Sequence, residues 1–324
     1  GIATSVLLGW LSYSLVETRL RAFIFDSNRR ARTQWQIAFG AFAMILLTAG
    51  IGWKSDGLAQ VRTAGFSPET RARLADYKAA TTDWVGIRDC ADRTRVGESQ
   101  RCNIIGGGRK RVLLLGDSYV EQTYPRVARL AERNGIDVTL LFQPGCPPLP
   151  DIAWPGRHDR CAKFFDAARE IVAQEKFDKI VIFSAWGFYF NALKSSPLAP
   201  CRLTFGDCTV MSPDQGRAAL DTAFDGLGDW LAAQRAHGRD IVLILPRPTN
   251  TRLTPELLYQ YTFDAGQPVL QRPVLLSTYN AQMGYARALL MREARRSDAK
   301  LVDPTKFRCG VAGCPAYEYG KFLF

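Results

Sequence analysis

The chain has 324 residues, of which 47% are hydrophobic, and this length suggests about two domains or one domain with an appendage. The net charge is +11, but the Lys and Arg residues are spread among acidic residues without a long basic run that includes aromatic residues, which argues against nucleic-acid binding. The first residue is Gly1 and not Met, so we expect a fragment of a longer protein.

Two N-terminal segments are typical of membrane-spanning helices. Residues 1–16 carry no charge, and Trp35 to Trp53 form an uncharged stretch with a Trp at each end. At about 1.5 Å per residue the second stretch covers about 28 Å, close to the thickness of a hydrocarbon core. We therefore predict two transmembrane helices within residues 1–53. A buried helical hairpin of a soluble domain is the alternative.

The connection between these segments is rich in arginine, which predicts its orientation. It contains Arg19, Arg21, Arg29, Arg30 and Arg32, against only two acidic residues. Short loops of this kind lie in the cytoplasm by the positive-inside rule. Everything after Trp53 should then lie on the opposite side of the membrane.

All the cysteines follow the second predicted span. They are Cys90, Cys102, Cys146, Cys161, Cys201, Cys208, Cys309 and Cys314. An even number of cysteines on the exported side predicts disulfides, and pairing between sequence neighbours is the simplest arrangement because each bond then closes a short loop. Zinc is the competing interpretation, but the chain has no CxxC pair and only two histidines, so we expect no metal site.

Residues 54–109 are predicted to form a linker or extension on the exported side. Ser67 and Pro68 have the pattern of a helix start, with Ser67 as N-cap and Pro68 in the first turn. The polar stretch from Cys90 to Cys102 is expected to be a loop closed by a disulfide, and residues 106–108, all glycine, a flexible joint.

From residue 110 onward, predicted strands and helices alternate, which indicates an α/β fold with a mostly parallel sheet and helices on both faces. The predicted strands are 111–115, 137–142, 179–184, 241–245 and 300–302, and the predicted helices are 121–134, 161–175, 213–236 and 277–296. Right-handed connections bring the carboxyl ends of these strands to one edge of the sheet. The segments that follow the first four strands should therefore meet there.

Ser118 follows the first of these strands and precedes a helix. In that position its hydroxyl could attack an acyl carbon while backbone N–H groups at the helix N-terminus hold the resulting oxyanion. The alternative is that Ser118 only caps the helix, because serines between a strand and a helix are common N-caps.

These residues resemble a known family. The string Gly116-Asp117-Ser118 is similar to the first sequence block of SGNH hydrolases and acetyltransferases, and residues 11–21 (LSYSLVETRLR) resemble the end of the last core helix of membrane acyltransferase family 3. The ordered combination is similar to fused bacterial glycan O-acetyltransferases over essentially the whole chain. The resemblance implies an SGNH, flavodoxin-like sheet from residue 110, preceded by the end of a membrane region.

Position by position, the resemblance implies Ser118 as the nucleophile and as one oxyanion donor. Gly145 is the expected second donor, with a simple turn glycine as its alternative. Asp117, Tyr119 and Trp186 are candidates for the acceptor pocket, and for Trp186 the favoured alternative is a buried aromatic residue without a role. The Gly-x-Asn-Asp of the third block is replaced by Ser184-Ala185-Trp186, so a third donor is unassigned.

The resemblance also implies a catalytic Asp-x-x-His after the last strand, and no such string is present up to Phe324. We expect these residues beyond the chain end and the fragment to be catalytically incomplete. His158 and His237 both precede the final strand and are not expected to be the base, and Asp303 is interpreted as the start of a loop.

The implied activity is O-acetylation of a cell-surface glycan, such as lipopolysaccharide O-antigen or exopolysaccharide, through a serine acyl-enzyme in the periplasm. Acetyl-CoA would be the acyl donor for a membrane region, and this part of the chain would bind no cofactor itself. An esterase or deacetylase shares the same acyl-enzyme, and a non-catalytic glycan-binding module is the other alternative.

Overall fold

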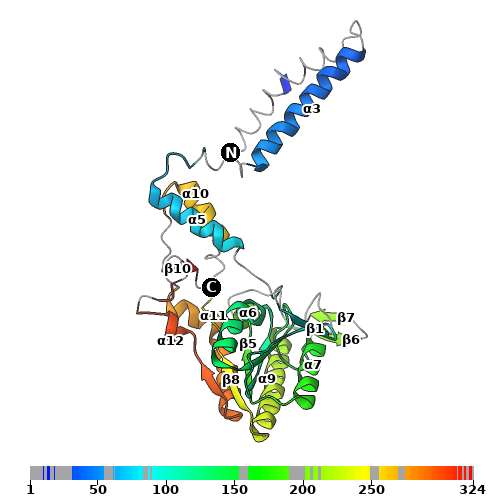
Figure 1. The fold of residues 1–324 in the computed structure, drawn as a ribbon, viewed down its shortest axis with the longest axis vertical. Coiled ribbons are helices and arrows are strands. Elements are labelled where there is room, and N and C mark those ends of the chain that lie inside the picture. Colours follow the sequence, from blue (N-terminus) through cyan, green and yellow to red (C-terminus); the bar gives the residue numbers. More distant parts are fainter. Residues whose placement is uncertain are drawn as a thin grey trace. The chain divides into compact units, whose positions relative to one another are not determined.

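The computed structural model describes most of the chain in two compact units, residues 1–71 and 72–324. The described residues are 31–54, 63–82, 90–152, 160–189, 201–204, 207–210, 213–248, 255–268, 274–311, 313–315, 317–318 and 321–322, together with residues 10, 13, 14, 18, 61 and 87. Each unit is described separately below (Figure 1).

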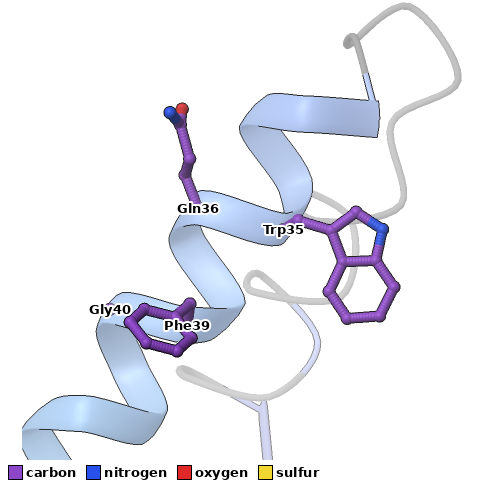
Figure 2. Close-up of a pocket in the computed structure, with 4 residues that line it drawn as sticks. All are labelled: Trp35, Gln36, Phe39 and Gly40. Carbon is purple, nitrogen blue, oxygen red and sulfur yellow. The ribbon is translucent and has the colours of Figure 1, made fainter.

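The first unit is built around helix α3 (Ala31–Lys54), which contains the whole stretch from Trp35 to Trp53. Its apolar side chains are largely exposed, from 50% for Ile51 to 92% for Trp53. Figure 2 shows Trp35 and Phe39 projecting from α3, where they line a pocket together with Gln36 and Gly40. Among the helices that the structure describes, none is long and apolar enough to cross a membrane, so the two predicted spans are not confirmed. The first span and the Arg-rich connection lie almost entirely outside the described residues.

The second unit contains a mixed seven-stranded sheet with the order β1-β2-β4-β3-β5-β8-β9. Its parallel part consists of β3 (Arg111–Gly116), β4 (Asp137–Phe142), β5 (Lys179–Phe183), β8 (Asp240–Ile244) and β9 (Lys300–Val302). Numbered along the chain, these five strands have the order 2-1-3-4-5 of doubly wound sheets, in which ligands bind at the carboxyl ends of the strands. The predicted α/β fold is confirmed.

The predicted helices of this region are also confirmed, with ends that differ by at most three residues. They are α6 (Ser118–Asn134), α7 (Arg160–Gln174), α9 (Pro213–Ala236) and α11 (Leu276–Arg296). Helix α5 (Pro68–Thr82) begins as predicted, because the Ser67 hydroxyl accepts a hydrogen bond from the N–H of Thr70 at 3.1 Å. Besides β1 and β2, the described elements that sequence patterns did not predict are α8 (Trp186–Tyr189), α10 (Pro255–Ala265), α12 (Thr305–Arg308) and the strand pairs β6 (Cys201–Thr204) with β7 (Asp207–Val210) and β10 (Tyr317–Glu318) with β11 (Lys321–Phe322).

Two hydrophobic clusters cover the two faces of the sheet. Leu113 and Leu115 point into the larger cluster, which includes residues of α7, α9 and α11. Val112 and Leu114 belong to the other cluster, which contains residues of α6. This alternation follows the two-residue period of a strand, so that helices pack on both faces (Figure 1).

The sheet begins earlier than the sequence patterns indicated. Strands β1 (Asp92–Val96) and β2 (Ser99–Ile104) form a hairpin that pairs antiparallel with β4, so residues assigned to a linker belong to the sheet. The glycines that follow are held in place and do not form a free joint, and Gly106 and Gly108 are closely packed. The N–H groups of Gly106 and Gly107 donate to Asp137 Oδ1 at 2.9 and 3.1 Å, and a Cβ on Gly108 would lie 1.4 Å from the carbonyl oxygen of Gly135.

Disulfides join sequence neighbours, as predicted, wherever the structure describes the cysteine side chains. The bonds are Cys90–Cys102, Cys146–Cys161 and Cys309–Cys314. Cys201 and Cys208 lie on β6 and β7, which pair antiparallel, but their side chains are outside the described residues. Each of the three bonds closes a short loop, which the chain-entropy argument values at about 2 to 3 kcal/mol before strain.

Candidate active site

The carboxyl ends of three parallel strands bring the predicted site segments together. Gly116, the last residue of β3, pairs in register with Phe142 of β4 on one side and Phe183 of β5 on the other. The N–H of Gln143 then donates to the carbonyl of Gly116 at 3.2 Å. Gly116 must be glycine, because a Cβ there would lie 1.7 Å from the carbonyl oxygen of Phe183. The loops that contain Ser118 and Gly145 and the one that begins at Ser184 therefore start at the same edge.

Asp117, and not Ser118, caps helix α6. The backbone of Asp117 is extended, with φ −99° and ψ −153°, and its Oδ1 accepts a hydrogen bond from the N–H of Tyr119 at 2.9 Å. Ser118 is the first helical residue, so the capping alternative for Ser118 is wrong. The Ser118 hydroxyl therefore does not serve as the cap of α6.

The carboxylate of Asp117 is fully buried and joins two loops of the edge. Its Oδ2 accepts hydrogen bonds from the Ser184 hydroxyl at 3.0 Å, the Ala185 N–H at 2.9 Å and the Tyr189 hydroxyl at 2.7 Å. Burial raises the pKa of Asp117, and the four hydrogen bonds oppose that shift without cancelling it. Asp117 therefore fixes the position of the Ser118 turn against the loop that follows β5.

Ser118 is half-buried at the N-terminus of α6, and no hydrogen bond to its hydroxyl or its backbone N–H is found in the part of the chain that the structure describes. The first N–H groups of a helix have no partner within the helix and create a positive end that favours negative charge. This geometry suits a nucleophile whose product is an oxyanion.

Gly145 lies in a tight turn after β4. The Cys146 N–H donates to the carbonyl of Gln143 at 3.0 Å, Pro144 occupies the second position, and Gly145 has φ 73° at the third. Such a turn requires a residue with positive φ at the third position, which explains the glycine. The turn glycine alternative is thus met, and the role of Gly145 as an oxyanion donor stays a prediction.

Tyr119 and Trp186 occupy different environments. The Tyr119 ring is half-buried and lies 5.7 Å from the ring of Phe183, with the guanidinium of Arg247 3.8 Å above its centroid. Trp186 has no exposed surface, packs against Phe224 and donates from Nε1 to the carbonyl of Ile244 at 3.1 Å. The structure thus places Trp186 in the core, because its large ring fills the space under the sheet, and not in a pocket for an acceptor.

The comparisons with known proteins agree with this geometry. A family described as "SGNH domain (fused to AT3 domains)" matches residues 89–324. This chain belongs to that family. Its SGNH domain begins before β1, which agrees with the inclusion of the hairpin in the sheet.

Among the solved structures to which this chain is similar is one described as "Structure of Salmonella ser. Paratyphi A lipopolysaccharide acetyltransferase periplasmic domain". It is 15% identical to this chain and has a TM-score of 0.42, and the match covers 67% of this chain and 74% of that chain. A comparison with curated proteins finds no match.

The described part of the SGNH domain places no histidine at the Ser118 edge. His237 lies between the end of α9 and the start of β8, at the opposite edge of the sheet, where its Nδ1 is 2.6 Å from the carbonyl oxygen of Ala233. His158 lies outside the described residues. His237 is therefore not placed to accept the proton of Ser118, and the expectation for His158 stays a prediction.

Asp303 begins the loop after β9, as predicted. Its carboxylate accepts two hydrogen bonds from Arg287, at 3.1 and 2.7 Å, and further ones from the hydroxyl and N–H of Thr305. Burial raises the pKa of Asp303, but these hydrogen bonds outweigh it and bring the pKa down to about 2. The Asp303 carboxylate therefore holds this loop in place. No cluster of possible metal ligands occurs among the described residues of the chain.

Ser184, Ala185 and Tyr189, which hold Asp117, were not assigned this role from the sequence. The Ala185 contact uses a backbone N–H, which leaves no sequence signal, and the position of Tyr189 depends on the short helix α8. Arg247 was also missed as a neighbour of Tyr119. Its only signal was its position after the fourth parallel strand, at the predicted edge.

Proposed function

We propose that this chain is part of an O-acetyltransferase that modifies a cell-surface glycan, with Ser118 as the nucleophile. The observation that carries the proposal is the position of Ser118. It is the first residue of α6, directly after a buried parallel strand, and the neighbouring Asp117 already supplies the N-cap. Membership of the SGNH family fused to AT3 domains supports acyl chemistry at this serine.

In the proposed reaction, the Ser118 oxygen attacks the carbonyl carbon of an acetyl donor while a base takes the hydroxyl proton. The tetrahedral oxyanion would be stabilised by the N–H of Ser118 and by that of Gly145. The base then gives that proton to the departing donor group, and collapse leaves acetyl-Ser118. A glycan hydroxyl attacks the same carbon while the base takes its proton. The base then returns this proton to the serine oxygen as the acetylated glycan is released. The acidic and basic partners of Ser118, an Asp and a His in the family pattern, are part of the proposal and lie outside the described residues.

Transfer to a glycan and hydrolysis share this acyl-enzyme and differ in the second nucleophile. The fusion to AT3 domains in the family description favours transfer, because a hydrolytic esterase needs no membrane partner to supply acyl groups. Acetyl-CoA, used by the membrane region on the cytoplasmic side, is the proposed source of the acetyl group. A non-catalytic glycan-binding module is the second candidate, since the third SGNH block is replaced by residues that hold Asp117.

We also propose that residues 1–53 are the end of a membrane acyltransferase region at the bacterial inner membrane, that residues 54–109 include the linker, and that the SGNH domain lies in the periplasm. The disulfides and the exposed apolar side chains of α3 support this arrangement. Cysteine labelling in intact cells tests it. An impermeant reagent should label a cysteine introduced at residue 60 but not one at Asn28. The reverse pattern would exclude the proposed orientation.

The decisive test of the activity is Ser118→Ala in the full-length protein. We expect transfer of acetyl groups to glycan to fall by at least about 10³-fold, because the covalent route is removed. Stability should change by less than about 0.5 kcal/mol, because Asp117 provides the cap and the Ser118 hydroxyl makes no described hydrogen bond. Mass spectrometry of the glycan measures the first quantity and thermal unfolding the second.

Ser67→Ala is the matched control. Ser67 is an N-cap, so this change should cost about 1 kcal/mol of stability and leave transfer unchanged. A fluorophosphonate probe that labels wild type but not Ser118→Ala would separate an enzyme from a binding module. If Ser118→Ala retains near wild-type transfer, Ser118 is not the nucleophile.

A further inference from the structure

Two arginines at the carboxyl edge of the sheet, Arg247 and Arg308, have buried N–H donors without a partner and no carboxylate partner among the described residues. Arg247 follows β8 and Arg308 ends α12, which follows β9. Strands β8 and β9 are parallel neighbours, and the N–H of Leu245 donates to the carbonyl of Val302 at 2.9 Å. Both arginines therefore come from adjacent loops on the same edge as Ser118.

Arg247 lies directly beside the nucleophile turn. Its guanidinium is 3.8 Å from the ring centroid of Tyr119, the residue that follows Ser118. Its Nε is buried and has no hydrogen-bond partner, and no ion pair with a carboxylate is found for it among the described residues. The contact with an aromatic face fixes the plane of the guanidinium but satisfies none of its N–H donors.

Arg308 repeats this pattern. It is half-buried, and its Nη1 is buried without a hydrogen-bond partner. Burial lowers the pKa of Arg308, and the nearby positive charge of Arg247 lowers it further. Two like charges that are close together and partly removed from water are unfavourable unless an anion lies between or beside them.

Two described carboxylates of the same edge, Asp303 and Asp117, are already bound elsewhere. Asp303 is held by Arg287 and Thr305, and Asp117 by four neutral donors. The backbone beside the arginines is held in place as well. The Tyr279 hydroxyl donates to the carbonyl of Pro246, and Cys309 forms a disulfide with Cys314. The donors are thus fixed in position before any ligand arrives.

We propose that Arg247 and Arg308 form a binding site for an anionic group of the acceptor, a carboxylate or a phosphate on the glycan that Ser118 acetylates. Planar guanidinium groups bind both anions through paired N–H donors, and that of Arg247 contacts Tyr119, one residue from the nucleophile. The acceptor is then an acidic glycan, and the site places one of its hydroxyls at acetyl-Ser118. This inference rests on the proposed function for the identity of the ligand, and its test needs no turnover.

The test is a binding measurement on the full chain carrying Ser118→Ala, by isothermal titration at low salt. The probes are a glucuronate-containing oligosaccharide, the matched neutral glucose oligosaccharide, and the same neutral sugar carrying a phosphate. We expect at least one anionic probe to bind about tenfold or more tightly than the neutral one. The probe that shows the preference identifies the anion as carboxylate or phosphate.

Arg247→Gln and Arg308→Gln should each reduce that preference to less than about twofold. Arg111→Gln removes a positive charge that is paired with Glu175 at the opposite edge, and should leave the preference unchanged. Neither Arg247→Gln nor Arg308→Gln should lower the melting temperature, because each removes an unpaired buried donor. Equal binding of all three probes, or a preference that survives both substitutions, would overturn the site. So would a fall in melting temperature without a change in preference, which indicates a structural role. Retained acetyl transfer in Ser118→Ala would refute the proposed function while leaving the measured preference intact.

Discussion

The two edges of the central sheet differ in how their charged side chains are paired. At the amino edge, Glu175 binds Arg111, the first residue of β3, at 2.9 Å, and also Arg101 of β2. At the same edge, Arg235 lies between Asp298, at 3.0 Å, and Asp240, at 3.3 Å. The carboxyl edge has one such pair, Arg287–Asp303, but it also carries a buried carboxylate held by neutral donors, at Asp117, and two arginines, Arg247 and Arg308, without carboxylate partners in the described structure.

This difference separates groups that serve folding from groups available for function. Exposed ion pairs such as Arg235–Asp298 each contribute about 0 to 1 kcal/mol to the free energy of unfolding. Their guanidinium groups already bind carboxylates. Buried donors without a partner cost stability, so their presence beside the Ser118 turn requires another reason. Gln143, which is 5% exposed directly after β4, has an Oε1 without a partner and follows the same pattern. We infer that the carboxyl edge retains these groups for a substrate.

The largest effect is expected from removing Asp117, the carboxylate that fixes the carboxyl edge of the sheet. Asp117→Ala leaves the donors of Ser184, Ala185 and Tyr189 without their acceptor and removes the cap of α6. We expect a loss of about 3 kcal/mol or more in the free energy of unfolding, measured by urea denaturation. Transfer activity should also fall, because the Ser118 turn is no longer fixed.

Tyr189→Phe is the graded control for that variant. It removes a single donor to Asp117 and keeps the ring, so the expected loss is about 1 kcal/mol. Equal stability of Asp117→Ala and wild type would mean that the hydrogen bonds around Asp117 do not hold the edge together.

Asp303 tests how far a charged pair stabilises the carboxyl edge, because its carboxylate is paired with Arg287 there. Its pKa of about 2 lies below its ordinary value of 3.8, so its contribution to stability is present above 3.8 and is lost as the pH falls through 2. Asp303→Asn should therefore cost about 2 kcal/mol at neutral pH. The difference from wild type should shrink between about pH 5 and pH 2 in urea titrations. A difference that does not depend on pH would show that the charge of Asp303 is not what stabilises this loop.

The parallel part of this fold could be predicted from local patterns. Buried strands such as 111–115 are continuous apolar runs, and helix signals between them fix the direction of each connection. The position of Ser118 at the carboxyl edge follows from that topology alone. The β1–β2 hairpin could not be predicted in the same way, because both strands are mostly polar, β1 is mostly exposed, and the pairing of β2 with β4 is a non-local choice.

The partners of individual side chains were the part that sequence could not supply. Ser118 as the helix N-cap and Asp117 as the N-cap are equally compatible with the string Asp117-Ser118, and only the backbone geometry separates them. For the same reason the sequence did not decide whether Trp186 lines a pocket or lies in the core, where the structure places it, because aromatic residues occur in both. The cysteine pairs were predictable because short loops leave few alternatives.

The smallest expected effect tests the amino edge, with Glu175→Gln. The hydrogen bond from Arg101 is the main cause that lowers the pKa of Glu175, burial opposes it, and Arg111 adds to the lowering. A lowered pKa means that the stabilisation is present above the ordinary value of 4.5 and is lost as the pH falls below it. Because the pair is only partly buried, we expect a loss of about 1 kcal/mol or less at neutral pH, and none when the group is protonated in acid. Glycan acetylation should be unchanged, since the pair lies at the edge away from Ser118. A clear loss of transfer in this variant, without a matching loss of stability, would show that the two edges do not divide folding from function as proposed.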